Sequence, residues 1–297
     1  MKNIVVVGSL NMDIVIKAPY MPDNGVTITG SDFMTNPGGK GANQAAAIGK
    51  CGGNCIMVGC VGNDFGNDLI SALKSCRVNT DYIVKRSDTA SGIAVIIVVD
   101  GDNRIILNKG ANMFLNKEAI DKALSKCNSG DYLVTQLEIE NEVVEYALIQ
   151  AKRKGMLTIL NPAPARSVDK ELFKYCDYFI PNQSETKFYT GIYPEDENSV
   201  LNAVKELKNF GISNVVITMG SKGAAFEENG KIKIIPALKV NAVDTTAAGD
   251  TFVGAFICGL SENMSVEDAI IFAIKAAAIT VTRKGAQKSI PERSEIK

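Results

Sequence analysis

The stretch Asp244-Thr-Thr-Ala-Ala-Gly-Asp250 places two carboxylates around very small residues, directly ahead of an apolar run at 252–260. Small residues allow another molecule to approach the backbone closely. If the apolar run is a helix, the Ala-Ala-Gly segment forms its first turn, whose free N–H groups and positive dipole end make an anion site. A carboxylate is electrostatically unfavourable at the mouth of such a site. Asp250 is therefore interpreted as a base beside a phosphate, with simple helix capping as the alternative.

A second group of polar residues follows the first predicted strand. Residues 4–7 are a continuous β-branched run that ends at Gly8, which is typical of a buried strand. Asn11 and Asp13 then alternate with apolar neighbours, so their side chains share one face of an extended chain. Ligands bind beyond the carboxyl ends of strands in open α/β sheets, which makes this pair a candidate for ligand binding. An ordinary loop with turn-forming Asn and Asp is the alternative.

A glycine-rich segment, Asn36-Pro-Gly-Gly-Lys-Gly-Ala-Asn43, opens an alanine-rich run that predicts a helix. Such an entry permits close approach by a polyhydroxy ligand or a phosphate. The segment is not a Walker A loop, because the chain contains no G-x-x-x-x-G-K-[ST]. It is not a dinucleotide fingerprint either, because that motif should directly follow the first strand.

Composition excludes several classes of function. The net charge of the 297-residue chain is −1, so it has no broad basic surface for nucleic acid. No segment approaches the roughly 20 apolar residues that a membrane span needs, and the N-terminal apolar stretch is too short for a signal peptide. Seven cysteines without disulfide or zinc spacing predict reduced, mostly buried thiols in a cytoplasmic protein. The chain has no histidine, so a general base must be Asp, Glu, Lys, Tyr or Cys.

The remaining sequence predicts one α/β domain over 1–297, a three-layer sandwich with a mostly parallel central sheet. Short strands at about 14–36 and a hairpin within about 90–108 predict a small second sheet, inserted as a lid. Further strands are predicted at 55–61, 131–137, 156–160, 177–180 and 214–218, with a hairpin at 224–240. Helices are predicted at 64–75, 117–126, 141–154, 168–174, 184–189, 197–210 and 266–282. Polar residues at strand ends, which favour a crevice along the carboxyl edge of the sheet, are Gln136, Glu138, Asn161, Asn182, Glu185, Thr218, Gly220 and Ser221.

Five motifs occur in the order seen in the ribokinase-like sugar kinases, and the resemblance covers essentially the whole chain. They are Gly8-Ser-Leu-Asn-Met-Asp13, Pro37-Gly-Gly-Lys-Gly-Ala-Asn-Gln44, Asn182-Gln-Ser-Glu185, Asp244-Thr-Thr-Ala-Ala-Gly-Asp250 and Thr282-Arg-Lys-Gly-Ala-Gln287. Each motif alone is modest, but five in order are specific. The resemblance implies a nine-stranded sheet with a β lid, lids that clasp in a homodimer, and ATP-dependent phosphorylation of D-ribose at its 5-hydroxyl.

The resemblance also implies roles for individual residues. Asp250 would be the catalytic base, and Ala247, Ala248 and Gly249 would form the anion hole around the transferred phosphoryl group. The residues implied in sugar binding are Asn11, Asp13, Gly39, Lys40, Gly41, Asn43, Glu138 and Asp250 itself. Those implied in ATP binding are Asn182, Glu185, Thr218, Gly220, Ser221, Lys222, Gly223 and Gly249, with Glu185 holding Mg²⁺ through water. An activating K⁺ would lie in a loop pair formed by Asp244, Thr246, Thr280, Arg283, Gly285 and Ser289. The helix around Phe272 carries no implied adenine contact, because Ile274 stands where a polar residue is common.

Two alternatives remain open. A kinase of the same fold could act on another sugar or a nucleoside. A non-catalytic sugar-binding protein could use the same scaffold, although it would have no need of Asp250. A nicotinamide-dependent dehydrogenase is disfavoured by the position of the glycines.

Overall fold

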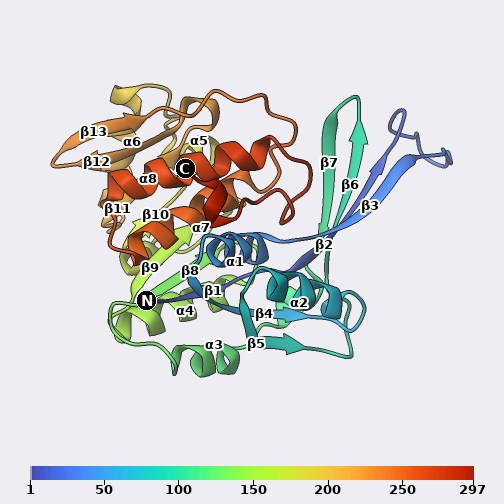
Figure 1. The fold of residues 1–297 in the computed structure, drawn as a ribbon, viewed down its shortest axis with the longest axis horizontal. Coiled ribbons are helices and arrows are strands. Elements are labelled where there is room, and N and C mark those ends of the chain that lie inside the picture. The colour runs from blue at the N-terminus through green and yellow to red at the C-terminus, as the bar shows by residue number, and fades with distance from the viewer. Residues whose placement is uncertain (1) are drawn as a thin grey trace.

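The computed structural model describes residues 2–297. A nine-stranded sheet lies between two layers of helices, and a separate four-stranded sheet stands beside them (Figure 1). The strand order of the large sheet is β13-β12-β11-β10-β9-β8-β1-β4-β5. Strands from β11 to β5 pair in parallel, whereas β12 and β13 are antiparallel. The bounds of these strands are β1 Asn3–Val7, β4 Asn54–Val61, β5 Asn79–Lys85, β8 Tyr132–Gln136, β9 Leu157–Asn161, β10 Tyr178–Phe179, β11 Asn214–Thr218, β12 Ala224–Glu228 and β13 Lys231–Ile235. The predicted three-layer α/β fold with a mostly parallel sheet is confirmed.

Side chains of the central strands alternate between two hydrophobic cores. In β1, Ile4 and Val6 enter one core, while Val5 and Val7 enter the other. The first core lies under α1 (Lys40–Lys50), α2 (Gly66–Ser75), α7 (Ala248–Ser261) and α8 (Val266–Val281). The second lies under α3 (Lys117–Leu124), α4 (Asn141–Arg153) and α6 (Glu197–Asn209), with α5 (Gln183–Thr190) beside α6. A strand buried on both faces needs such a continuous apolar run, which is why residues 4–7 were predictable.

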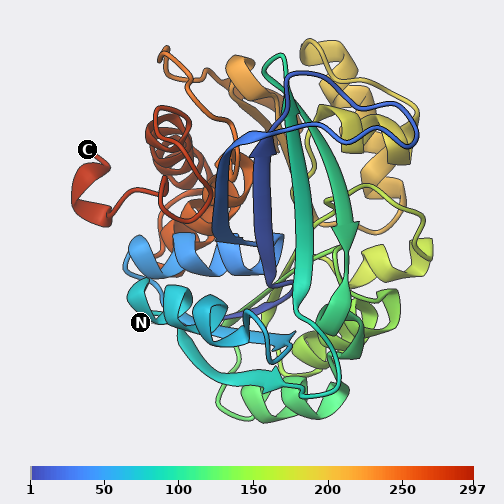
Figure 2. The ribbon, with the colours of Figure 1, turned by 90° about the vertical axis from the view of Figure 1, so that its right-hand side faces the viewer.

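The small sheet projects from the body of the molecule, as two perpendicular views show (Figures 1 and 2). Its order is β3-β2-β6-β7, with bounds β2 Asn11–Lys17, β3 Ser31–Gly38, β6 Gly92–Val99 and β7 Asp102–Asn108. The predicted second sheet, which joins the 14–36 region to the hairpin, is confirmed. Because β2 begins directly after β1 and β3 leads into α1, the base of this sheet lies at the carboxyl edge of the large one.

The chain leaves β1 toward β4 on one side and later returns to β8 on the other. The carboxyl ends of β1 and β8 therefore flank a topological switch point, where open α/β sheets bind ligands. Gly8 and Ser9 follow β1 there, and Glu138 follows β8.

Some elements differ from the prediction. Strand β5 was not predicted, because its sequence, Asn-Thr-Asp-Tyr-Ile-Val-Lys, opens with three polar residues. The predicted helix at 168–174 is a 3₁₀ helix, Lys170–Tyr175, and β10 has only two residues. All seven cysteines are buried, as expected. Within residues 2–297, no helix is both long and apolar enough to cross a membrane.

Candidate active site

Glycines bring the start of α1 against the end of β1. Gly39 precedes the helix with φ 90°, a conformation that side chains rarely adopt. A Cβ atom at Gly41 would lie 2.6 Å from the carbonyl carbon of Gly8, so only glycine permits this approach. The N–H of Ala42 also donates to the carbonyl of Ser9, at 2.9 Å. The glycine-rich segment therefore fixes the first turn of α1 over the switch point.

Glu138 joins the two sides of the switch point through one carboxylate oxygen. Its Oε2 accepts from the hydroxyl of Ser9 at 2.6 Å, from the backbone N–H of Lys40 at 3.0 Å and from Asn11 Nδ2 at 3.4 Å. Asn11 Oδ1 in turn accepts from Asn112 Nδ2 at 2.8 Å. The small sheet, α1 and the end of β8 thus share one polar network.

Asp13 lies on the same strand as Asn11, close to two other carboxylates. Burial, together with the charges of Glu138 and Asp250, raises the pKa of its carboxyl to about 7. A Cβ atom at Gly38 would lie 2.4 Å from Asp13 Oδ2, so a side chain at position 38 would collide with the carboxylate. The ammonium of Lys40 loses hydration through burial, yet its pKa is raised because Asp250, Glu138 and Glu185 surround it. Lys40 thus offsets part of the negative charge here.

Asp250 lies on the first turn of α7 and is held by two side-chain amides. Asn43 Nδ2 donates to its Oδ2 at 3.0 Å, and Gln44 Nε2 donates to its Oδ1 at 3.1 Å. Gln44 is fixed in turn, because its amide also donates to Asn161 Oδ1 at 3.0 Å and its Oε1 accepts from Gln136 Nε2 at 2.6 Å. Asp250 is 7% exposed, but it lines a cavity rather than the apolar core. The side chains that orient the carboxylate therefore come from α1 and the ends of β8 and β9.

That cavity, of about 230 Å³, opens at the start of α7 and the carboxyl ends of three strands. Ala247 precedes the helix in the left-handed conformation, with φ 60°, and a Cβ atom at Gly249 would meet nothing within 4 Å. The N–H of Ala248 donates to the carbonyl of Thr245 at 3.2 Å, but the N–H groups of Gly249 and Asp250 have no intrahelical acceptor, so this turn presents donors to the open side. Residues that line the cavity include Lys40, Asn161, Ile180, Asn182, Glu185, Thr218, Ala247, Gly249 and Asp250. The predicted helix start is therefore an uncrowded turn beside the carboxylate of Asp250.

Asn182 and Glu185 line this cavity while forming the cap of α5. Asn182 Oδ1 accepts from the N–H of Glu185, and Glu185 Oε2 accepts from the N–H of Asn182, both at 2.8 Å. Burial raises the pKa of Glu185, while the Asn182 N–H and the charge of Lys40 oppose that shift. The capping box therefore positions a buried carboxylate at the edge of the cavity, with its Oε1 atom outside the cap.

The predicted nucleotide loop lies just beyond the cavity. Thr218 ends β11 and lines the cavity, but Gly220, Ser221 and Lys222 form an exposed 3₁₀ turn outside it. Gly223 has φ 106°, and a Cβ atom there would lie 1.9 Å from the carbonyl oxygen of Ile235. The structure therefore brings Thr218 to Asp250 and leaves the next turn facing solvent.

The two loops predicted to hold a cation are joined through Asp244. Its Oδ1 accepts from the N–H and hydroxyl of Thr246, at 2.9 and 2.6 Å, and its Oδ2 accepts from the N–H of Gly285 at 2.9 Å. Burial alone would raise the pKa of Asp244, but these hydrogen bonds lower it. Three side chains of the predicted potassium site have partners within the protein instead. Thr280 donates to the Ala276 carbonyl, Ser289 donates to the Ala286 carbonyl, and Arg283 pairs with Glu295. A cation here would depend on backbone carbonyls.

Residues 1–293 match the model of the pfkB family of carbohydrate kinases. The chain belongs to this family. The kinase is 40% identical over 296 residues to ribokinase of Haemophilus influenzae, an alignment that covers 99% of this chain and 97% of that protein. It is 38% identical over 292 residues to deoxyribokinase of Salmonella typhi, covering 97% and 95%. The structure of Arabidopsis thaliana ribokinase complexed with ribose and ATP is 32% identical and has a TM-score of 0.93, with 99% of this chain and 97% of that chain covered.

Several residues that organise the site of this carbohydrate kinase were not singled out from the sequence. Ser9 and Asn112 hold Glu138 and Asn11, and Gln44 holds Asp250. Gln44 carried a detectable signal, since it is a polar residue within an alanine-rich segment, and the structure shows it to be fully buried. Asn112 carried none, because it follows the small sheet in a 3₁₀ turn far from every motif.

Proposed function

We propose that this carbohydrate kinase transfers the γ-phosphoryl group of ATP to the 5-hydroxyl of D-ribose, giving ribose 5-phosphate and ADP. One observation carries the proposal most directly: the carboxylate of Asp250 lies on an open helix start and accepts from Asn43, and its charge contributes to the raised pKa of Asp13. A phosphate at the helix start and a sugar beside Asn43 would then meet at that carboxylate. The relatives named ribokinase support the choice of sugar.

An unpaired amide oxygen supports a polyhydroxy substrate. Asn43 is 6% exposed, and its Oδ1 has no hydrogen-bond partner within residues 2–297. Its Nδ2 is committed to Asp250, so Oδ1 remains to accept from a ligand. A buried acceptor without a partner is unfavourable, and a sugar hydroxyl would relieve that cost. Asn11, Asp13 and Glu138 supply further acceptors, and Gly39 and Gly41 permit the close approach of α1 to the end of β1 that brings Asn43 to the site.

In the proposed reaction, Asp250 accepts the proton of the 5-hydroxyl of ribose. The hydroxyl oxygen of the sugar forms a bond to the γ-phosphorus, and the bond between the γ-phosphorus and the oxygen of the departing ADP breaks. Phosphoryl transfer depends mainly on positioning and charge stabilisation, and its loose transition state does not need a strong base. The N–H groups of the 247–249 turn would stabilise the charge that develops on the phosphoryl oxygens. Asn43 and Gln44 hold the carboxylate in place, so it need not reorganise during transfer.

Two cations complete the proposal. Mg²⁺ bound to ATP would neutralise phosphate charge, and the buried carboxylate of Glu185 fits a ligand that acts through water. ATP would extend from the 247–249 turn toward Thr218 and the exposed 220–222 turn. K⁺ would bind between the Asp244 and 280–289 loops, where carbonyl oxygens suit a monovalent ion and Asp244 supplies a negative charge.

The small sheet supports a homodimer. Phe33, Met34, Ile105 and Ile106 are 68%, 45%, 60% and 67% exposed, and they lie on its outer strands β3 and β7. Large apolar side chains that are this exposed are typical of interaction surfaces. Two lids that clasp would cover them. The enzyme would act in the cytoplasm, where buried free thiols remain reduced.

Steady-state rates with D-ribose, 2-deoxy-D-ribose, D-fructose and adenosine test the substrate. The proposal expects the highest kcat/KM with D-ribose. The similarity to a deoxyribokinase makes 2-deoxyribose the main competitor. A higher kcat/KM with 2-deoxyribose would reassign the substrate. Sugar binding without any sugar-stimulated ATP consumption would favour a non-catalytic sugar-binding protein.

A further inference from the structure

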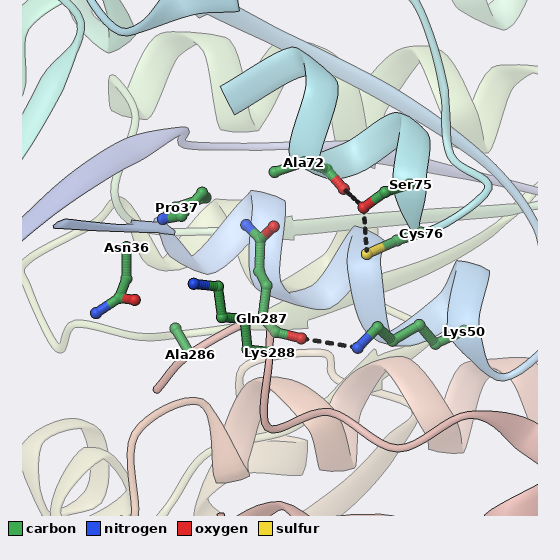
Figure 3. A pocket seen from close by; sticks show the side chains of 9 residues that line it. All are labelled: Asn36, Pro37, Lys50, Ala72, Ser75, Cys76, Ala286, Gln287 and Lys288. Carbon is green, nitrogen blue, oxygen red and sulfur yellow. Dashed lines mark hydrogen bonds between the residues drawn. The ribbon is translucent and has the colours of Figure 1, made fainter. Parts of the chain in front are cut away.

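A second cavity lies away from the proposed active site, between α1, α2 and the loop that follows α8 (Figure 3). Its volume is about 270 Å³. Pro37, Ala72 and Ala286 contribute apolar wall, while Gln287 and Lys288 contribute polar groups. Gln287 ends one of the five motifs noted in the sequence, but the proposed reaction gives it no role.

The amide of Gln287 indicates that this cavity has an occupant. Gln287 is 6% exposed, and neither its Nε2 nor its Oε1 has a hydrogen-bond partner within residues 2–297. Its side chain extends from the loop toward Pro37 and α2 (Figure 3). A buried amide without partners is costly, and a change of its rotamer toward the cavity would sacrifice no hydrogen bond. A polar ligand in the cavity would therefore gain this amide as a partner.

The electrostatic character of the cavity favours an anion. Lys50 Nζ donates to the carbonyls of Gln287 at 2.9 Å and Ile290 at 2.8 Å, and an ammonium has a third N–H to donate. The ammonium of Lys288 points toward Asn36 across the cavity (Figure 3). Among the described residues that line the cavity, none is acidic. Two lysines and an amide therefore line a cavity that also has an apolar wall.

We propose that this cavity binds a small organic anion, a carboxylate or a phosphate monoester with a compact carbon skeleton. The anionic group lies between Lys288 and the amide of Gln287, because charge-assisted hydrogen bonds are the strongest contacts available there. The carbon skeleton packs on Ala72 and Pro37. The volume limits the ligand to a few carbon atoms, well below the size of a nucleotide.

Occupancy of the cavity is coupled to the loop that reaches Asp244. The residues on the cavity side, Ala286 to Lys288, directly follow Gly285, whose N–H donates to Asp244 Oδ2 at 2.9 Å. A ligand that holds this loop therefore changes the response of the enzyme to K⁺. This coupling, unlike the binding itself, rests on the proposed K⁺ role of the Asp244 loop pair.

Calorimetry with the full-length enzyme tests the binding, with ribose and a non-hydrolysable ATP analogue present to occupy the active site. The probes are glutarate and glycerol 3-phosphate, and their neutral counterparts are 1,5-pentanediol and glycerol. At least one anion is expected to bind, and its neutral counterpart is not. The two anions distinguish a carboxylate site from a phosphate site. Equal binding of the neutral counterparts, or no binding of either anion, would overturn the proposal.

Matched variants locate the binding. Lys288→Gln is expected to weaken it about tenfold, the typical effect of losing one charge-assisted hydrogen bond. Ala72→Leu fills the cavity without changing charge and should abolish binding. Lys74→Gln is the control, because Lys74 is an exposed residue of α2 that does not line the cavity. Anion affinity unchanged in Lys288→Gln and Ala72→Leu would place the bound anion elsewhere and contradict the proposal.

Kinetics test the coupling separately. The bound anion is expected to shift the K⁺ concentration for half-maximal rate in the wild-type enzyme but not in Ala72→Leu. Anion binding without such a shift would refute the coupling alone. A rate that does not respond to K⁺ even without the anion would refute the K⁺ role of the Asp244 loop pair, while the calorimetry would still decide the binding.

Discussion

Gln44 Nε2 donates to Asp250 Oδ1 at 3.1 Å and links the proposed base to the ends of two parallel strands. The same amide donates to Asn161, and its Oε1 accepts from Gln136. All four side chains are buried. The orientation of the Asp250 carboxylate is therefore set by the sheet as well as by α7.

Replacement of this amide should slow phosphoryl transfer more than it weakens sugar binding. For Gln44→Leu we expect kcat to fall by about ten- to a hundredfold, because misplacement of a reacting group carries costs of that order. The KM for ribose should change little, since Gln44 does not face the sugar residues. Gln136→Leu is the control, because it disturbs the same network one residue further from Asp250 and should have a smaller effect on kcat. An increase in KM at constant kcat would contradict a positioning role.

Sugar affinity should depend on pH through Asp13. Its pKa of about 7 in the free enzyme means that it is largely protonated at pH 6 and largely ionised at pH 8. The ionised carboxylate accepts hydrogen bonds from two hydroxyls, so the Kd for ribose should fall as pH rises through 7, by at most about tenfold per pH unit. Calorimetric titration at pH 6, 7 and 8 measures this, and Asp13→Asn should remove the dependence. A Kd that rises with pH would show that the protonated form binds the sugar.

The same shift predicts the stability of the free enzyme. Because the pKa of Asp13 is raised above its value of 3.8, the folded state binds more protons than the unfolded state between about pH 4 and 7. The contribution of Asp13 to stability is therefore fully present below pH 4 and is lost as pH rises through 7. Thermal unfolding should show Asp13→Asn to be more stable than the wild type at pH 8. Equal unfolding temperatures at pH 8 would indicate that the carboxylate is not desolvated.

Glycine should be required at position 39 because a Cβ atom there would be too close to Asn11, and not only because of the positive φ. Gly39 and Gly52 both have positive φ, 90° and 91°, but a Cβ atom at 39 would lie 2.8 Å from the N atom of Asn11, while one at 52 would meet nothing within 4 Å. Gly39→Ala should therefore lose most activity and destabilise the fold. Gly52→Ala should incur only the backbone cost of about 1 kcal/mol. Comparable losses in the two variants would show that crowding at Asn11 is unimportant.

The response to monovalent cations tests the loop pair around Asp244. At constant ionic strength, the rate should be higher in KCl than in NaCl or choline chloride. Asp244→Ala should abolish the difference, since it removes the acceptor for the N–H groups of Thr246 and Gly285. Arg283→Met is the control, because its guanidinium pairs with Glu295 and leaves Asp244 untouched. A wild-type rate that does not distinguish these salts would refute the role of Asp244 in cation binding.

The elements that could be predicted from the sequence are those with a local residue pattern. The β-branched run at 4–7, the apolar run after Asp250 and the glycine-rich entry at 38–41 are local patterns, and each forms the expected element. The partners of these elements were harder to predict, because Gln44, Asn112 and Ser9 act through contacts with residues far away in the chain. The 220–222 turn is a different case, because the predicted motif does follow β11 but its residues face solvent and do not line the cavity.

Kinetic and binding measurements on Asp250→Asn test the central proposal most directly. The variant keeps the volume and polarity of the side chain but cannot accept the proton of the sugar hydroxyl. We expect kcat to fall by about 10²- to 10⁴-fold, the usual contribution of a general base, with the Kd for ribose changed by less than about threefold. A kcat close to that of the wild type, or a loss of ribose affinity in step with kcat, would contradict the assignment of Asp250 as the base.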